Sequence, residues 1–139
     1  MIDFSFRRRK PGIGRADTDQ SLLAYLFRES RAMLSIIDRE GRYVTVNPVF
    51  CRYLKVSEEE MTGRHLSDLW GKETYKNIIA GKLQTCFSGQ TVRYQADFYL
   101  GSSGEKYFEV TFYPLKNNEG EIVYVLAESL DITELKLSV

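Results

Sequence analysis

Residues 33–48 of the chain read MLSIIDREGRYVTVNP. Two short runs of apolar and β-branched residues flank the polar turn DREGR, in which Gly41 can adopt a positive φ. Asn47 can cap a helix and Pro48 suits the first helical position, so the second run ends where a helix begins. This stretch therefore predicts a β-hairpin that leads directly into a helix.

Upstream of the hairpin, residues 17–31 predict an amphipathic helix that Asp17, Thr18 or Asp19 can cap. Its apolar side chains recur at helical spacing: Leu22, Leu23, Leu26 and Phe27. Such a stripe must be covered, either by the domain's own sheet or by a second copy of the chain. We therefore assign these residues to an N-terminal capping and dimerisation helix and expect a homodimer. Before this helix, residues 1–16 combine a basic run with glycines, which predicts a flexible basic leader.

Downstream of the hairpin, several short helices are expected. Ser57 followed by Glu60 has the spacing of a capping box, which opens a short helix that ends near Gly63. A further helical turn is expected over residues 66–70, and helical spacing returns over residues 73–87.

The last third of the chain predicts three strands, over residues 92–99, 107–113 and 122–130. We expect Pro114 to end the regular pairing of the second strand, and the near-continuous apolar run of the third predicts burial on both of its faces. The order of helix, two strands, short helices and three strands is typical of an α+β fold. It predicts a five-stranded antiparallel sheet with short helices on one face and a pocket between the two layers.

The composition narrows the classes of function. The 139 residues suit one domain, and Lys+Arg and Asp+Glu balance at 19 each, which favours neither nucleic acid nor an anionic membrane as a partner. No apolar run approaches the roughly 18 residues of a membrane span and no signal-peptide pattern is present, so we expect a cytoplasmic domain. A membrane anchor elsewhere in the parent protein is compatible with this expectation. Cys51 and Cys86 are widely spaced and are expected to be reduced, partly buried thiols.

The segment from Met33 to Thr133 carries a series of short marks in order: Ile37-Asp38, Gly41, Val46-Asn47-Pro48, Phe50, Leu54, the run from Ser57 to Arg64, and Leu130-Asp131-Ile132-Thr133-Glu134. Together these marks resemble a PAS domain along its whole length. The resemblance implies a five-stranded antiparallel sheet, a pocket lined by sheet and helices, and a role in sensing or dimerisation inside a signalling protein. On this resemblance, we expect residues 32–133 to form the sensory domain. Residues 134–139 then begin a C-terminal linker helix to an effector outside the chain, of the histidine kinase or diguanylate cyclase type.

Two polar residues mark the point where the last strand is expected to leave the sheet. Asp131 and Thr133 have short side chains that can hold the strand end and cap a following helix. In a PAS domain that helix runs on toward an effector. The resemblance therefore implies that Asp131 and Thr133 transmit the signal.

The expected pocket is formed by side chains that turn toward the interior. They are mostly apolar, with few polar anchors: Ser35, Ile37, Phe50, Leu54, Leu66, Ile79, Phe98, Phe108, Val110, Phe112, Val125, Ala127 and Ser129. A pocket lined in this way would take a small apolar or aromatic ligand. A core filled by its own aromatic side chains would produce the same pattern, so a ligand sensor and a pure dimerisation scaffold both stay open.

The residues at the matching positions argue against the known cofactors of such domains. Light-sensing relatives of the LOV type carry a Gly-Arg-Asn-Cys-Arg-Phe-Leu motif whose cysteine bonds flavin, and Leu66 stands at the place of that cysteine. Haem-binding relatives use a histidine from the long helix before the third strand, and residues 73–87 contain none. His65, the only histidine, and two scattered cysteines make no metal site. The resemblance is therefore to PAS domains of a non-LOV, non-haem type, without covalent flavin or haem.

Catalysis is a third alternative, because some α+β domains of this size are cavity enzymes. Such sites need titratable side chains that face inward, but Asp97 and Glu109 fall on the polar faces of their strands. No catalytic-triad order, phosphate-binding glycine loop or HExxH motif appears, so we expect a non-catalytic domain.

A scaffold would use the N-terminal stripe together with the outward-facing Tyr107, Thr111 and Tyr113.

Overall fold

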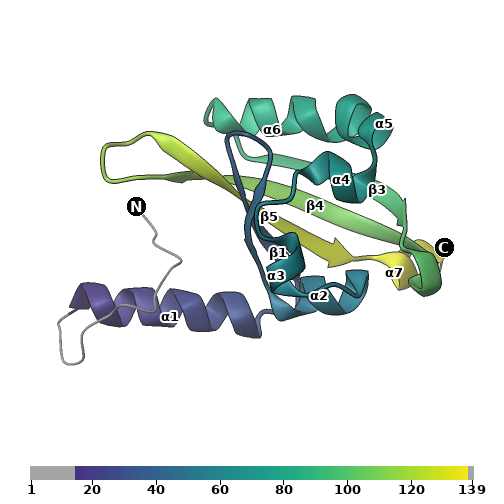
Figure 1. Cartoon of the computed structure of the whole chain (residues 1–139), viewed down its shortest axis with the longest axis horizontal. Coiled ribbons are helices and arrows are strands. Elements are labelled where there is room, and N and C mark those ends of the chain that lie inside the picture. Colours follow the sequence, from purple (N-terminus) through teal and green to yellow (C-terminus); the bar gives the residue numbers. More distant parts are fainter. Residues whose placement is uncertain (1–14, 138–139) are drawn as a thin grey trace.

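The computed structural model of the chain describes residues 15–137. Five strands form one antiparallel sheet in the order β2-β1-β5-β4-β3 (Figure 1). Their bounds are β1 Met33–Asp38, β2 Tyr43–Val46, β3 Val92–Tyr99, β4 Glu105–Lys116 and β5 Ile122–Asp131. The predicted sheet is confirmed. Residues 1–14 of the predicted leader, its basic run included, and residues 138–139 of the predicted linker lie outside the described residues.

Short helices follow the hairpin and cover one face of the sheet (Figure 1). They are α2 Pro48–Leu54, α3 Glu58–Met61, α4 Leu66–Trp70, α5 Lys72–Thr74, the π-helix η1 Tyr75–Ile79 and α6 Ala80–Phe87. A 3₁₀ turn, η2 Gly101–Ser103, joins β3 to β4, and α7 Thr133–Leu137 follows β5. The predicted α+β fold class is confirmed. Within residues 15–137, no helix is long and apolar enough to cross a membrane.

Asn47 holds the junction between the hairpin and the first covering helix. Its fully buried Oδ1 accepts hydrogen bonds from the backbone N–H groups of Leu34 (3.0 Å) and Phe50 (3.1 Å). Its Nδ2 donates to the carbonyl groups of Phe27 (3.1 Å) and Ala32 (2.9 Å). All four hydrogen-bonding positions of the amide are thus occupied. The predicted helix cap is confirmed, and the same side chain also ties the end of the N-terminal helix to the domain.

The core lies between the inner face of the sheet and the covering helices. Its fully buried side chains include Phe50, Phe108, Ile37, Val125 and Cys86. Burial of a large apolar side chain contributes about 1.5–3 kcal/mol, so this layer supplies most of the driving force for folding. Both thiols are free; Cys51 is half-buried, whereas Cys86 is fully buried and not partly buried as predicted.

The N-terminal helix α1 spans Arg15–Glu29, two residues earlier at each end than predicted. It extends away from the sheet (Figure 1), and its apolar side chains are largely exposed: Leu22 by 54%, Tyr25 by 61% and Leu26 by 53%. Phe27, near its C-terminal end, is half-buried. The domain's own sheet therefore does not cover the apolar stripe of α1.

Pro114 does not end the pairing of β4, contrary to the sequence prediction. The strand continues to Lys116, and Pro114 pairs with Val125 of β5. The register explains this continuation, since β3 begins at Val92, opposite Phe112. Beyond that point β4 has a neighbour on one side only, and proline is tolerated on such an edge.

Strand β5 is not buried on both faces, which corrects the expectation from its apolar sequence. Val125 and Ala127 are buried on the inner face, whereas Tyr124 and Leu126 on the outer face are half-buried and Leu130 is 42% exposed. The helices from α2 to α6 lie against the inner face (Figure 1). The outer side chains of β5 therefore lack a covering layer of helices.

Candidate functional site

A cavity of about 40 Å³ lies between the inner face of the sheet and the helices that cover it. It is lined by Met33, Ser35, Ile37, Tyr43, Phe50, Leu66, Trp70, Ile79, Tyr94, Phe98, Val110, Phe112, Ala127 and Ser129. All of the predicted pocket residues line it except Leu54, Phe108 and Val125. Phe108 and Val125 are fully buried in the surrounding core, and Leu54 is half-buried against the same core.

Four lining residues were missed in the sequence prediction. Met33 and Tyr94 could have been found from strand alternation, because Met33 shares a face with Ser35 and Tyr94 shares one with Phe98. Trp70 lies four residues after Leu66, on the same face of α4. Tyr43 had no such signal, since its place beside the cavity depends on how β2 packs against the helices.

The polar groups around the cavity are hydroxyls and one indole. The Trp70 Nε1–H donates a 2.8 Å hydrogen bond to the hydroxyl of the buried Tyr43. Within residues 15–137, no protein group hydrogen-bonds to the hydroxyls of Ser35, Tyr94 or Ser129. Ser35 is only 4% exposed, so its hydroxyl meets the cavity and not the surrounding solvent. Burial raises the pKa of both Tyr43 and Tyr94, so these phenols stay neutral and able to donate.

The cavity volume limits what this conformation can hold. About 40 Å³ accommodates one or two water molecules, whereas pockets for drug-sized ligands measure roughly 300–1,000 Å³. The aromatic side chains of Phe50, Trp70, Tyr94 and Phe98 occupy most of the space between the layers. A guest the size of one ring therefore requires these side chains to move.

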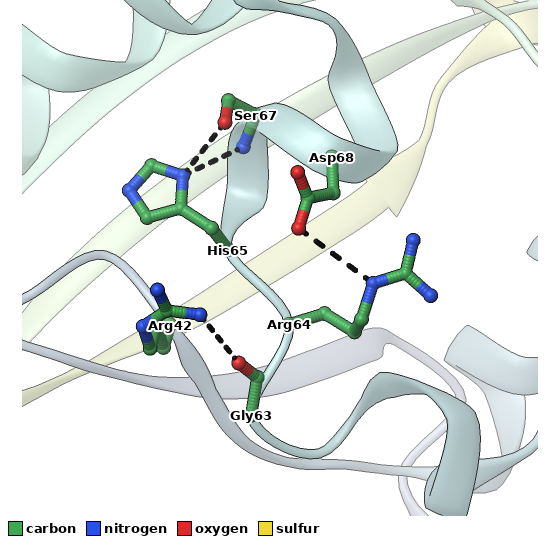
Figure 2. Close-up of polar contacts among 6 residues, drawn as sticks. All are labelled: Arg42, Gly63, Arg64, His65, Ser67 and Asp68. Carbon is green, nitrogen blue, oxygen red and sulfur yellow. Dashed lines mark hydrogen bonds and ion pairs between the residues drawn. The ribbon is translucent and has the colours of Figure 1, made fainter.

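His65 caps helix α4, which supplies Leu66 and Trp70 to the cavity wall. Its Nδ1 accepts a 3.1 Å hydrogen bond from the Ser67 backbone N–H and lies 2.9 Å from the Ser67 hydroxyl (Figure 2). Nδ1 must therefore lack a proton in this state. The sequence prediction placed this histidine in a loop without a ligand role, and the structure gives it a capping role.

The loop before His65 is held by neighbouring polar contacts (Figure 2). Arg42 Nη1 donates a 2.8 Å hydrogen bond to the Gly63 carbonyl, and Arg64 Nε lies 3.7 Å from Asp68 Oδ2. The same region leaves no space at Gly41. A Cβ there would lie 2.8 Å from both His65 Nε2 and the Tyr75 hydroxyl.

The helix predicted over residues 73–87 contains a π-helical segment. It starts at Lys72 and runs through α5, η1 and α6, and η1 ends at the cavity-lining Ile79. Such segments are uncommon and occur often at functional sites. No local sequence signal distinguishes this π-turn from the α-helix on either side.

A second set of polar contacts joins the helical layer to the C-terminal helix. The Tyr53 hydroxyl on α2 donates a 2.8 Å hydrogen bond to Asp131 Oδ2, and Asp131 Oδ1 accepts from the backbone N–H (2.9 Å) and the hydroxyl of Thr133. The Thr133 hydroxyl oxygen in turn accepts from the Tyr107 backbone N–H (3.0 Å). We call Tyr53, Tyr107, Asp131 and Thr133 the C-terminal cluster. It connects α2, β4 and β5 to the first residue of α7.

The surroundings of the C-terminal cluster favour a charged Asp131 and a neutral Tyr53. Burial raises the pKa of Asp131, but hydrogen bonds from Thr133 and Tyr53 and the charge of Lys106 outweigh it, so this pKa lies below its ordinary value. Burial, followed by the hydrogen bond to Asp131 and its charge, raises the pKa of Tyr53 to about 12. Asp131 is therefore an anionic acceptor and Tyr53 a neutral donor at neutral pH. Tyr53 was not among the predicted signal residues.

An aromatic path runs from the cavity to the C-terminal cluster. The ring of the cavity-lining Phe98 lies 6.2 Å from that of Phe108, which lies 5.6 Å from that of Tyr53. Phe50, another lining residue, is on the same helix as Tyr53. Both lining residues are therefore linked by direct contact or by a shared helix to Tyr53, the donor to Asp131.

The outward-facing residues expected at a scaffold interface are less exposed than predicted. Thr111 is only 2% exposed, and its hydroxyl accepts a 3.2 Å hydrogen bond from Arg93 Nε. Tyr107 and Tyr113 are half-buried, and Tyr113 donates to Glu128 (3.3 Å). Among the described residues, exposed apolar side chains instead lie on α1, on α7 and at Tyr99 of β3.

The described residues hold no group of three or more potential metal ligands. Burial raises the pKa of Cys86 to about 11, and burial is also the main cause of the raised pKa of Cys51. Both thiols are therefore weak nucleophiles at neutral pH. Asp97 is exposed, and Glu109 is half-buried and does not line the cavity.

Comparison with known proteins gives a family match. Residues 27–137 match a family model described as the PAS fold. One relative is the probable diguanylate cyclase DgcE of Escherichia coli (strain K12), which is 24% identical over 140 residues. That alignment covers 98% of this chain and 12% of DgcE, so the chain spans a small part of the relative's length.

Solved structures share the architecture. The chain superposes on an RNA-binding light-oxygen-voltage receptor with a TM-score of 0.72, at 18% identity over 92% of this chain and 36% of that one. It superposes on the PAS domain of an HTR-like protein from Haloarcula marismortui with a TM-score of 0.63, at 26% identity over 85% of this chain and 95% of that one. The first likeness shows the fold alone.

Proposed function

The chain belongs to the PAS fold family, and from this premise we propose that it is a sensory module of a longer signalling protein that relays its state through the C-terminal cluster into α7. The observation that carries the proposal is the unbroken series of contacts from Phe98 through Phe108 and Tyr53 to Asp131 and Thr133. It joins the central cavity to the point where the chain leaves the domain.

In this proposal the cavity has two conformations. The compact one has about 40 Å³ of free volume, and a second one admits a small apolar or aromatic guest after movement of Trp70 or Phe98. Ser35, Tyr94 and Ser129 offer hydroxyls that no protein group engages within the described residues, so a guest with one polar atom fits best. Binding acts by favouring one of two pre-existing arrangements.

A filled-core scaffold is the second candidate, and the small cavity volume supports it. In that case α1 and α7 would change their packing in response to a partner and not to a small molecule. Native mass spectrometry of the purified chain separates the two candidates. A releasable added mass that Ser129→Leu abolishes supports the sensor, and a chain without added mass in both proteins supports the scaffold.

The relay itself is tested by amide hydrogen exchange. Phe98→Leu removes the ring at the start of the path, and we expect faster exchange of the Tyr107 and Ile132 amides, which bond to Thr133 Oγ1 and the Tyr107 carbonyl. Tyr99→Leu, on the opposite face of the same strand and 79% exposed, is the matched control. Equal exchange in the two variants would contradict the relay.

We propose that the chain forms a homodimer through α1. Leu22 and Leu26 lie one helical turn apart, and more than half of each side chain is exposed. A second copy of α1 would cover them with an identical stripe. Leu22→Glu with Leu26→Glu should give a monomer in sedimentation velocity, whereas Arg28→Ala on the same helix should remain dimeric. A monomeric wild-type chain would overturn this part of the proposal.

The proposal also covers the type of effector that the module regulates and the cofactors that it lacks. The likeness to a probable diguanylate cyclase favours an effector of that type over a histidine kinase. The module itself is non-catalytic and cytoplasmic, which agrees with its free, protonated thiols. Leu66 at the place of the flavin-bonding cysteine, and the absence of histidine from residues 72–87, argue against covalent flavin and against haem.

A further inference from the structure

We propose that a second site, on the surface beside the C-terminal cluster, binds a small phosphate-bearing molecule. The site is a groove of about 510 Å³ lined by Arg31, Val49, Arg52, Tyr53, Ser103 and Lys106. These residues come from the loop before β1, from α2, from the η2 turn and from β4. The groove does not share a lining residue with the central cavity. The inference is therefore independent of whether that cavity holds a ligand.

The charge in the groove is positive and largely uncompensated. Within the part of the chain that the structure describes, Arg31, Arg52 and Lys106 form no ion pair with a carboxylate. None of the described residues that line the groove is acidic, and the charge of Lys106 stabilises the nearby Asp131 carboxylate. Three cations therefore line one groove, on a chain whose net charge is zero. This local excess arises from the fold, because the three cations are far apart in sequence.

The lining chemistry indicates the class of ligand. Two guanidinium groups supply planar forks that bind phosphate or carboxylate through paired hydrogen bonds, and Lys106 adds a point charge. A phosphate dianion, with two charges and several acceptor oxygens, pairs with more of these three cations than a single carboxylate does. Ser103 adds a hydroxyl, and the volume lies in the range of small-molecule sites. A concave wall of like charges also raises the local concentration of anions.

The groove lies beside the C-terminal cluster, so a ligand bound there can act on the start of α7. Tyr53 lines the groove and donates to Asp131, and Lys106 both lines the groove and stabilises the Asp131 carboxylate. The η2 turn and α7 lie at the same end of the sheet (Figure 1). An anion bound to Lys106 competes with Asp131 for the same charge. Its binding should therefore weaken the hold of Asp131 on Thr133 and change the start of α7.

The test is a titration of the full chain with phenyl phosphate, followed by amide NMR, with phenol as the uncharged control. Phenyl phosphate should shift the amides of Arg52, Tyr53 and Lys106 saturably, and added salt should weaken its binding. Arg52→Ala with Lys106→Ala should lower the affinity at least about tenfold, since charge-assisted hydrogen bonds are lost. Lys76→Ala, which removes an exposed cation outside the groove, should leave the affinity unchanged.

Three outcomes would overturn the site. They are the absence of saturable shifts in the wild-type chain, equal affinity in the double variant, and an equal loss in Lys76→Ala.

The coupling has its own variant, because Tyr53→Phe keeps the cations but removes the bond to Asp131. It should retain binding, and the part of the phosphate-induced shift at the Thr133 amide that passes through the Tyr53–Asp131 hydrogen bond should be lost. An undiminished Thr133 response in Tyr53→Phe would disprove coupling through Tyr53.

Discussion

The Tyr53 hydroxyl donates a 2.8 Å hydrogen bond to Asp131 Oδ2 across 78 positions of sequence. This contact joins a helix of the covering layer to the end of the last strand. It is also the last step of the path from the cavity, through Phe98 and Phe108, to the residue that starts α7. Its removal should therefore change the C-terminal end of the domain, where α7 begins, more than its overall stability.

Tyr53→Phe tests this relationship. The ring and its contact with Phe108 are kept, so we expect a loss of only about 0.5–1.5 kcal/mol in the free energy of unfolding, the usual net value of one hydrogen bond. The Thr133 amide resonance should move, because Asp131 loses one of its donors. Urea unfolding and amide NMR provide the two readouts. An unchanged Thr133 resonance would show that Tyr53 does not act on α7.

The protonation of Asp131 should make the C-terminal cluster sensitive to acid. The folded pKa of Asp131 lies below its ordinary value, so the carboxylate stabilises the fold above the unfolded-state pKa. This stability is lost as the pH falls from the ordinary aspartate pKa through the folded one.

Asp131→Asn provides the comparison, because an amide does not titrate. The difference in urea midpoint between wild type and Asp131→Asn should shrink over that acid range. A difference that stays constant with pH would contradict the assignment of a charged acceptor. Since Asp131 is mostly exposed, solvent screens its interactions and the effect should be modest.

Asn47 should be far more sensitive than an ordinary helix cap. Asn47→Ala removes hydrogen bonds from four backbone groups, three of them buried, and we expect a loss of at least about 3 kcal/mol. Ser57→Ala is the matched control, because Ser57 caps α3 at an exposed site and should cost about 1 kcal/mol. Denaturant unfolding of both variants gives the comparison. Equal losses would mean that the burial of Asn47 adds nothing to its capping role.

Gly41 should tolerate no side chain. Its φ is +77°, and an added Cβ would meet His65 Nε2 and the Tyr75 hydroxyl at 2.8 Å, while His65 is held by its bonds to Ser67. Gly63 has a similar φ of +86° but open space around it, so Gly63→Ala measures the backbone effect alone, about 1 kcal/mol.

The energetic cost of the clash at Gly41 is the difference in stability between Gly41→Ala and Gly63→Ala. Gly41→Ala should cost about 1–3 kcal/mol more than Gly63→Ala, the usual range for overpacking. Thermal unfolding of both proteins measures this difference. Matching stabilities would indicate that Tyr75 and His65 can move aside without cost.

The parts of the fold that depend on local chemistry could be predicted from the sequence. The hairpin, the Asn47 cap and the Ser57–Glu60 capping box each involve neighbours along the chain, and all three occur as predicted. Strand alternation also placed most of the cavity lining. The expectation for Pro114 failed because tolerance of proline depends on whether β3 reaches that far, which is a property of the register.

The features on which the proposed function depends are less local. The contact between Tyr53 and Asp131, the burial of Thr111 beneath Arg93 and the groove beneath Arg31, Arg52 and Lys106 all depend on long-range packing. The free volume of the cavity depends on the rotamers of its aromatic side chains. Residue types at fixed spacing do not determine these quantities, and so the sequence left both a ligand pocket and a filled core open.

The most direct measurement of the relay is the response of the Thr133 amide resonance to a change inside the cavity. Ala127→Val adds two methyl groups to the cavity wall, and Leu126→Val changes the outer face of the same strand as a control. We predict that Ala127→Val shifts the Thr133 resonance in the wild-type background, that Leu126→Val does not, and that Tyr53→Phe abolishes the response. Two results would contradict the relay from the cavity to the C-terminal helix. One is a Thr133 resonance that does not shift in Ala127→Val, and the other is an equal shift when Ala127→Val is combined with Tyr53→Phe.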